Sequence, residues 1–120
     1  MRTFVSAKIH GVTVTACHLN YHGSQSLPVS LMKAVGIEAY EQVHVVNLKN
    51  GKRWVTYALP GPEGVCTLNG AAAHNGEPGD ELIVMAYRQE EQFSGASVAF
   101  VTHDNRLRET IRYPLEEAVA

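Results

Sequence analysis

The sequence predicts a mainly β fold, a small closed β-barrel with short helices. Short runs rich in β-branched or alternating residues recur along the chain, and turn residues separate them. Many short strands at close spacing in one small chain indicate a closed barrel. At 120 residues the chain has the usual size of one domain, so we expect residues 1–120 to form a single unit.

The strands are predicted from local patterns. Asn50-Gly51 marks a hairpin, because a type I′ turn needs positive φ at both central residues. Asp104-Asn105 lies between the last two predicted strands. The predicted strands are residues 3–10, 12–15, 42–48, 53–59, 65–68, 81–87, 97–102 and 106–112.

Helix signals are few. Pro28 suits a first helical turn, and the run from Val29 to Val35 continues to Gly36, which marks its end. Residues 70–74 are predicted as one helical turn that begins at a glycine, and the tail at 113–120 as frayed or weakly helical.

Composition and charge exclude several function classes. The net charge is −2, and no basic stretch is long enough for a nucleic-acid footprint. No apolar stretch approaches the ~20 residues that span a bilayer, and the first residues lack the apolar region of a signal peptide. Cys17 and Cys66 are too few for a disulfide framework. We therefore expect a cytoplasmic protein that binds neither nucleic acid nor membrane.

The histidines raise the question of a metal site. His18 and His22 are four residues apart, and Cys17 is adjacent to His18. No carboxylate joins them at a characteristic spacing, and the segment has the pattern of a strand followed by a loop. We therefore expect no bound metal.

Gly23 and Ser24 lie in a polar stretch between a predicted strand and the helix. Taken alone, a Gly-Ser pair is a common turn dipeptide, and Ser24 would be a turn hydroxyl. Other short motifs along the chain change this interpretation, although none is specific alone. They are Arg2-Thr3, Lys8-Ile9-His10, Val14-Thr15, Leu19-Asn20-Tyr21-His22-Gly23-Ser24, Asn50-Gly51-Lys52-Arg53, Thr56-Tyr57-Ala58, Asn69-Gly70-Ala71-Ala72-Ala73-His74 and Pro78-Gly79-Asp80.

In their order and spacing these motifs resemble the pyruvoyl-dependent aspartate 1-decarboxylases over nearly the full chain. The resemblance implies a double-psi β-barrel and a homotetramer with active sites between subunits. It also implies self-cleavage between Gly23 and Ser24, into a β chain of residues 1–23 and an α chain of residues 24–120. The implied activity is decarboxylation of L-aspartate to β-alanine and CO2, which supplies pantothenate and coenzyme A synthesis.

The residue types at the implied cleavage site suit the chemistry. Gly23 permits a strained backbone and clears space beside the scissile carbonyl. The Ser24 hydroxyl attacks that carbonyl, the amide shifts to an ester, and β-elimination leaves dehydroalanine, which hydrolyses to pyruvoyl with loss of ammonia. The resemblance gives Thr56 a part in this processing, where its hydroxyl polarises the oxyanion.

The cofactor implied by the resemblance is a covalent pyruvoyl group derived from Ser24. It condenses with the amine of aspartate to a Schiff base and acts as the electron sink that pyridoxal phosphate provides elsewhere. Neither pyridoxal phosphate nor a metal is then required. Some relatives use a helper protein for maturation.

Two cationic residues are expected to bind the substrate. The planar fork of Arg53 matches a carboxylate, and aspartate carries two. Without the resemblance, Arg53 would be an exposed arginine beside a hairpin turn. Lys8 matches a family lysine at the end of the first strand and is the candidate for the other carboxylate.

The remaining site residues also follow from the resemblance. Tyr57 is expected to protonate the intermediate after decarboxylation, since a phenol donates a proton while staying neutral beforehand; alone, it would be a barrel-core aromatic. Backbone N–H groups are expected to face the substrate where small side chains permit close approach, with a polar or aromatic pocket around them. The small residues are Gly70, Ala71 and Ala72, and the pocket residues are His10, Tyr21 and Asn69.

Two other functions remain open at this stage. One is a barrel that stays uncleaved and serves as a non-catalytic binding or regulatory module. The other is a related enzyme for another amino acid such as glutamate, because one extra methylene changes binding by only about 1–3 kcal/mol. The sequence departs from the family pattern at His18, at His22, at residues 25–29 and at residues 60–66.

Overall fold

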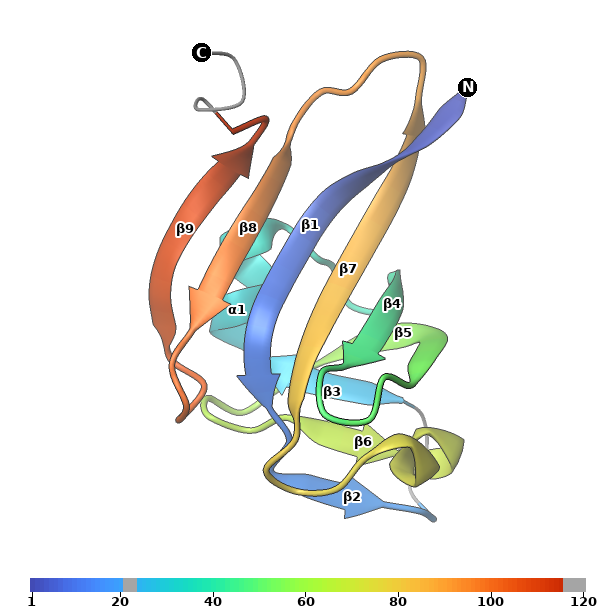
Figure 1. The fold of residues 1–120 in the computed structure, drawn as a ribbon, viewed down its shortest axis with the longest axis vertical. Coiled ribbons are helices and arrows are strands. Elements are labelled where there is room, and N and C mark those ends of the chain that lie inside the picture. The colour runs from blue at the N-terminus through green and yellow to red at the C-terminus, as the bar shows by residue number, and fades with distance from the viewer. Residues whose placement is uncertain (21–23, 116–120) are drawn as a thin grey trace.

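The computed structural model describes residues 1–20 and 24–115. The described chain is mainly β, as predicted: nine strands are hydrogen-bonded in the order β2-β6-β3-β5-β4-β7-β1-β8-β9 (Figure 1). One α-helix and one 3-10 helix accompany them in that part of the chain. The elements are β1 (Arg2–Thr13), β2 (Ala16–His18), β3 (Gln25–Pro28), α1 (Val29–Val35), β4 (Gln42–Asn47), β5 (Arg53–Gly61), β6 (Thr67–Asn69), η1 (Gly70–Asn75), β7 (Glu81–Glu90), β8 (Ala96–Val101) and β9 (Leu107–Tyr113).

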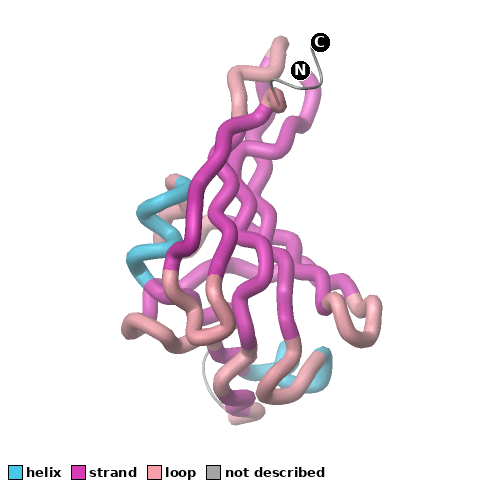
Figure 2. Tube along the Cα trace, turned by 60° about the vertical axis from the view of Figure 1, so that its left-hand side comes forward, coloured by secondary structure: helices cyan, strands magenta, loops and turns pink. Residues whose placement is uncertain are grey.

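The strands pair in both directions and over long sequence separations. β1 is antiparallel to β7 and parallel to β8, while β3 is parallel to β5 and antiparallel to β6. Figure 2 shows long strands running to the end of the molecule where both termini lie, and one helical segment beside short strand segments at the opposite end. This mixed pairing in a small, mainly β unit is consistent with the double-psi barrel that the resemblance implies.

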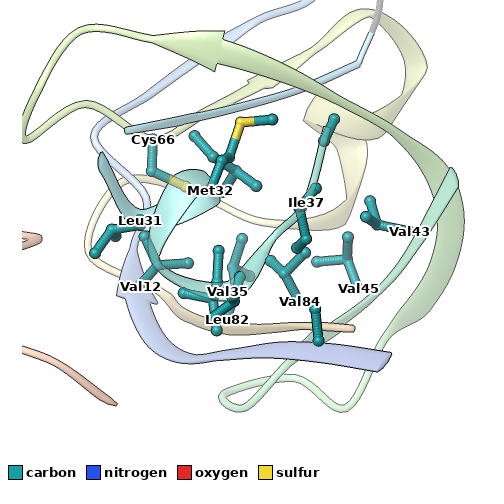
Figure 3. Packing of buried hydrophobic residues seen from close by; sticks show 14 of the residues in the cluster. Val12, Leu31, Met32, Val35, Ile37, Val43, Val45, Cys66, Leu82 and Val84 are labelled. Atoms are coloured by element: carbon teal, nitrogen blue, oxygen red, sulfur yellow. The ribbon is translucent and has the colours of Figure 1, made fainter. Parts of the chain in front are cut away.

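The hydrophobic core lies between the strands and α1. Residues that alternate along β1, β4 and β7 point inward, because successive side chains of a strand face opposite sides. Helix α1 contributes an apolar face to the same cluster (Figure 3). The buried residues from these elements are Ala7, Ile9, Val12, Leu31, Met32, Val35, Val43, Val45, Leu82, Val84 and Ala86.

The two internal helix predictions are confirmed, with one change at the start of α1. Of the tail predicted as frayed or weakly helical, Tyr113 belongs to β9, and residues 116–120 lie outside the described residues. Gly36 ends α1 in the left-handed conformation at φ 80°, and its N–H donates to the Met32 carbonyl at 2.9 Å. Pro28 does not occupy the first helical turn. It is the last residue of β3 and precedes α1 with an extended ψ of 128°. Residues 70–74 fall within η1.

The first two predicted strands form one. β1 runs through Gly11, whose φ of 95° lies in the region that favours glycine. The register with β7 shifts between His10 and Val12, which is a bulge at that glycine. A local kink, rather than a strand end, therefore separates the two runs of the sequence.

The hairpin between β4 and β5 forms as predicted, but its turn is not type I′. Gly51 has a φ of 75°, whereas among the described non-glycine residues only Tyr40 and Asn105 have positive φ. Residues 48–52 form a longer loop that asparagine side chains stabilise: Asn47 Oδ1 accepts from Lys49 N at 2.9 Å, and Asn50 Oδ1 from Lys52 N at 2.8 Å.

The prediction missed β2 and β3, which are short. β3 begins with Gln25, a polar residue that is fully buried. Its side-chain amide donates to the Thr67 carbonyl at 3.2 Å and to Cys66 Sγ at 3.4 Å. Burial raises the pKa of the Cys66 thiol to about 12, so Cys66 is a neutral core residue.

Candidate active site

Ser24 lies immediately before β3 and is 5% exposed. In β3, Gln25 pairs with Ala58 of β5 on one side and with Leu68 of β6 on the other. This register places Ser24 between Tyr57 and Asn69. The Ser24 hydroxyl donates to the Tyr57 carbonyl, and the Ser24 carbonyl accepts from Asn69 N at 2.9 Å. Both oxygens of Ser24 are therefore held by neighbouring strands.

An open pocket of about 340 Å³ lies at Ser24. It brings together six of the residues predicted for the site: Ser24, Thr56, Asn69, Gly70, Ala71 and Ala72. It also includes Trp54, Val55 and Asn75, which the sequence analysis did not select. Trp54 is two residues before Thr56 on β5, and residues two apart on a strand share a face, so this spacing was an available signal.

The 3-10 helix η1 forms one wall of the pocket. Its first residue, Gly70, has a φ of 62°, which turns the chain sharply after β6. The small side chains of Ala71 and Ala72 follow at the pocket. A backbone that carries such small groups can approach a bound molecule closely.

Asn69 connects η1 to the serine segment. The residue is 2% exposed, and its side-chain Nδ2 donates to Ser26 Oγ at 3.1 Å. Its Oδ1 is buried and has no hydrogen-bond partner among the described residues. Asn69 Oδ1, at the border of the pocket, can therefore accept a hydrogen bond from a bound molecule.

Tyr57 contributes its backbone, rather than its ring, to the surroundings of Ser24. Its side chain is 38% exposed and stacks on the ring of Tyr40, with centroids 6.1 Å apart and planes at 26°. On β5, Tyr57 alternates with Thr56 and Ala58, so the phenol points to the outer face of the strand.

Lys8, His10 and Arg53 also lie on the outer face of the sheet. Lys8 and His10 alternate with the core residues Ala7 and Ile9 on β1. As far as the structure describes the chain, these three residues do not line the Ser24 pocket.

Arg53 and His10 are far apart within one chain. His10 pairs with Ile83, Ile83 with Val46, and Val46 with Arg53. Three strand spacings separate His10 from Arg53, which is about 14 Å.

The surroundings of His10 favour its neutral form. Burial, and then the positive charge of Lys8, lower the pKa of His10. The ring lies 5.5 Å from the ring of Phe100, and Nδ1 is buried without a partner in the described chain.

Two predicted residues, Tyr21 and Gly23, lie outside the described residues, as does His22 of the rejected metal hypothesis. Within residues 1–20 and 24–115, no group of three or more His, Cys, Asp or Glu side chains is arranged to hold a metal ion. The same part of the chain contains no helix long and apolar enough to cross a membrane.

The fold and the site define a class of protein: a small, mainly β barrel that buries a serine at the start of a strand, beside a turn of glycine and alanine. The sequence model of the family described as aspartate decarboxylase matches residues 1–108. An aspartate 1-decarboxylase of Acaryochloris marina is 47% identical over 114 residues, which cover 90% of this chain and 87% of the relative.

Two further relatives are also named aspartate 1-decarboxylases. An aspartate 1-decarboxylase of Clostridium beijerinckii is 42% identical over 121 residues, covering 96% of this chain and 98% of the relative. Aspartate 1-decarboxylase 1 of Gloeobacter violaceus is 52% identical over 91 residues, which cover 74% of this chain and 77% of the relative. The chain therefore belongs to the aspartate decarboxylase family, and the resemblance found in the sequence is confirmed.

Proposed function

We propose that the chain is an aspartate 1-decarboxylase that converts L-aspartate to β-alanine and CO2 after cleaving itself between Gly23 and Ser24. The product would supply pantothenate and coenzyme A synthesis. The observation that carries the proposal is the position of Ser24, which is buried in a pocket with Thr56, Asn69 and residues 70–72. Membership of the family supports it and does not favour an uncleaved barrel that only binds a ligand.

Ser24 fits conversion to a covalent pyruvoyl group. Its carbonyl accepts the N–H of Asn69 at 2.9 Å, so the residue stays anchored on its C-terminal side when the bond before it is cut. Once formed, a pyruvoyl group supplies an electron sink for the loss of CO2. The enclosing side chains limit access of water to this position.

Each pocket residue has a role in this proposal. The hydroxyl of Thr56 stabilises the oxyanion that forms at Gly23 during cleavage. The backbone amides of residues 70–72 hold a substrate carboxylate, and Asn69 orients the reacting group. Tyr57 returns a proton to the carbon that loses CO2, for which a phenol has the right chemistry.

We further propose a homotetramer whose active sites lie between subunits. Lys8, His10, Arg53 and the Tyr57 ring occupy the outer face of the sheet, away from Ser24 of the same chain. A second copy that packs its outer face over the Ser24 pocket would bring Arg53 and Tyr57 to the substrate. Apolar side chains around that face support the packing, since Tyr40 is 74% and Val55 is 52% exposed.

The decisive experiment is the intact mass of the purified, denatured protein. We expect residues 1–23 as one fragment, and residues 24–120 as a second fragment lighter than a serine-started chain by the change from serine to pyruvoyl. The Ser24→Ala chain, the matched control, should stay uncut and release no CO2 from aspartate.

Three results would contradict parts of the proposal. A serine-started fragment means hydrolysis without a pyruvoyl group. A chain that stays uncut after long warm incubation contradicts unaided self-cleavage, and rescue by cell extract would then indicate a maturation helper. Faster turnover of glutamate than of aspartate would contradict the assignment of L-aspartate as the substrate.

A further inference from the structure

A buried polar pair, Asn47 and Asp80, lies at the C-terminal end of η1, next to Asn75, which lines the Ser24 pocket. Asn47 is fully buried and Asp80 is 4% exposed. Asn47 Nδ2 donates to Asp80 Oδ2 at 2.9 Å and to the carbonyl oxygen of Asn75, the last residue of η1, at 3.1 Å. Asn47 Oδ1 accepts from Lys49 N at 2.9 Å, so the amide uses all of its hydrogen-bonding groups.

Asp80 holds the segment that follows η1. Its Oδ2 also accepts from Glu77 N at 3.0 Å, and its Oδ1 lies 3.7 Å from Lys49 Nζ. Gly76 lies against the same two side chains. A Cβ at Gly76 would come within 2.8 Å of Asn47 Nδ2 and 3.2 Å of Asp80 Oδ2, so the contact leaves no space for a side chain.

Helix η1 is thereby fixed at both ends. At its start, Asn69 N donates to the Ser24 carbonyl, and at its end the Asn75 carbonyl is held by Asn47. Every residue of η1 is partly or fully exposed. Little apolar burial holds this helix, so its position depends on polar contacts: those at its two ends, and the exposed one from Lys52 Nζ to the His74 carbonyl at 3.1 Å.

We propose that Asn47 and Asp80 are positioning residues that hold η1 so that the amides of residues 70–72 face the substrate in the Ser24 pocket. The inference rests on the proposed function for the identity of that substrate. The pair does not touch the pocket itself and acts through the backbone of η1.

The chain provides a matched control. Asn50 Nδ2 donates to the same Asn75 carbonyl at 3.0 Å, but Asn50 is exposed. Water can replace an exposed hydrogen bond, whereas loss of the buried Asn47 amide removes one donor from Asp80 Oδ2 and one from the Asn75 carbonyl at a position that water reaches poorly. The two asparagines therefore differ in burial while they share one acceptor.

The first test is steady-state kinetics of the processed enzyme with L-aspartate. For Asn47→Ala we expect KM to rise about tenfold and kcat to stay within about twofold, because the η1 amides bind substrate and transition state alike. Asn50→Ala should leave both parameters within about twofold. Equal parameters for the two variants, or a loss confined to kcat, would overturn the inference.

Two variants of Asp80 separate positioning from charge. Asp80→Asn keeps an oxygen that can accept from Asn47 Nδ2 and Glu77 N, and we expect it to retain the KM of the unmodified enzyme within about threefold. Asp80→Ala removes that oxygen and should show the raised KM of Asn47→Ala. If Asp80→Asn raises KM as much as Asp80→Ala does, the positioning role is wrong.

A second readout does not depend on activity. In the uncleaved Ser24→Ala chain, amide hydrogen exchange at residues 70–72 should accelerate at least about tenfold with Asn47→Ala and remain unchanged with Asn50→Ala. If Asn47→Ala does not fold, Gly76→Ala tests the same contact by crowding it. Unchanged exchange in the folded variant refutes the inference, whereas absent aspartate turnover in the unmodified enzyme refutes only the proposed function.

Discussion

Ser24 illustrates how neighbouring strands prepare a single residue for chemistry. Its hydroxyl and its carbonyl are both engaged, the first by the backbone of Tyr57 and the second by that of Asn69. These partners belong to β5 and β6, which lie on either side of β3. An ordinary turn serine would instead be exposed to water. The burial of Ser24 is therefore a property of the strand pairing around it.

Asp80 gives the stability of the protein a defined dependence on pH. The hydrogen bond from Asn47 is the largest cause that lowers the pKa of Asp80, and the backbone N–H of Glu77 and the charge of Lys49 add to it. A carboxyl group with a lowered folded-state pKa adds stability above its unfolded pKa of about 3.9, and this stability is lost as pH falls through the folded value.

We therefore expect Asp80→Asn to lower the free energy of unfolding at pH 6, and the difference from the unmodified chain to shrink steadily below about pH 4. Urea unfolding curves of both chains, recorded between pH 2.5 and 7 at intervals of about one pH unit, measure this difference. Lys49→Met, which removes the charge next to Asp80, is the control and should reproduce only a small part of it. A difference that is constant over this range would contradict the assignment.

Among the elements, helix α1 depends for its stability on the residue that ends it. It spans only Val29–Val35, and a helix this short is marginal unless tertiary packing and capping support it. Leu31, Met32 and Val35 pack into the core, and Gly36 ends the helix with a φ of 80°.

Replacement of Gly36 tests this ending. A Cβ at Gly36 would meet nothing within 4 Å, so any cost of Gly36→Ala comes from the left-handed backbone rather than from a clash. We expect Gly36→Ala to reduce the free energy of unfolding by about 1–2 kcal/mol. Gly36→Asn should cost less, because asparagine tolerates this conformation better. Chemical denaturation measures both, and equal costs would contradict the conformational explanation.

For the whole molecule, the arrangement of the sheet predicts assembly. The outer face carries Arg53, Val55 and Tyr57 of β5 in one row along the strand, and Val55 also borders the Ser24 pocket. Apolar residues exposed in this way are typical of an interface. An active site that needs groups from this face and from the Ser24 pocket would be complete only in an oligomer.

We expect Val55→Asp to dissociate the oligomer while each chain stays folded, because burial of a carboxylate in an interface is costly. Leu107→Asp on β9, where the native side chain is 47% exposed, is the control and should leave the assembly intact. Light scattering after gel filtration gives the mass of each species. A monomeric unmodified protein, or an unchanged oligomer with Val55→Asp, would refute this mode of assembly.

The local pattern of the sequence determined the long elements. The period of apolar residues predicted β1, β4, β5, β7, β8 and β9, and a proline followed by an apolar run and a glycine predicted α1. These signals are local, because each depends on residues a few positions apart. The family motifs, such as Asn69-Gly70 and Gly23-Ser24, then indicated which residues belong to the site.

Only the tertiary structure decided where those residues lie. β3 is a strand because β5 and β6 flank it and because the Gln25 amide finds partners on Thr67 and Cys66, which no local pattern predicts. Strand register, set by contacts between distant segments, unites Ser24 with η1 and places Arg53 and Lys8 on another face. The sequence by itself therefore determined the types of the longer elements and the family, because both depend on local residue order. The geometry of the site depends on long-range pairing, which the folded chain alone provides.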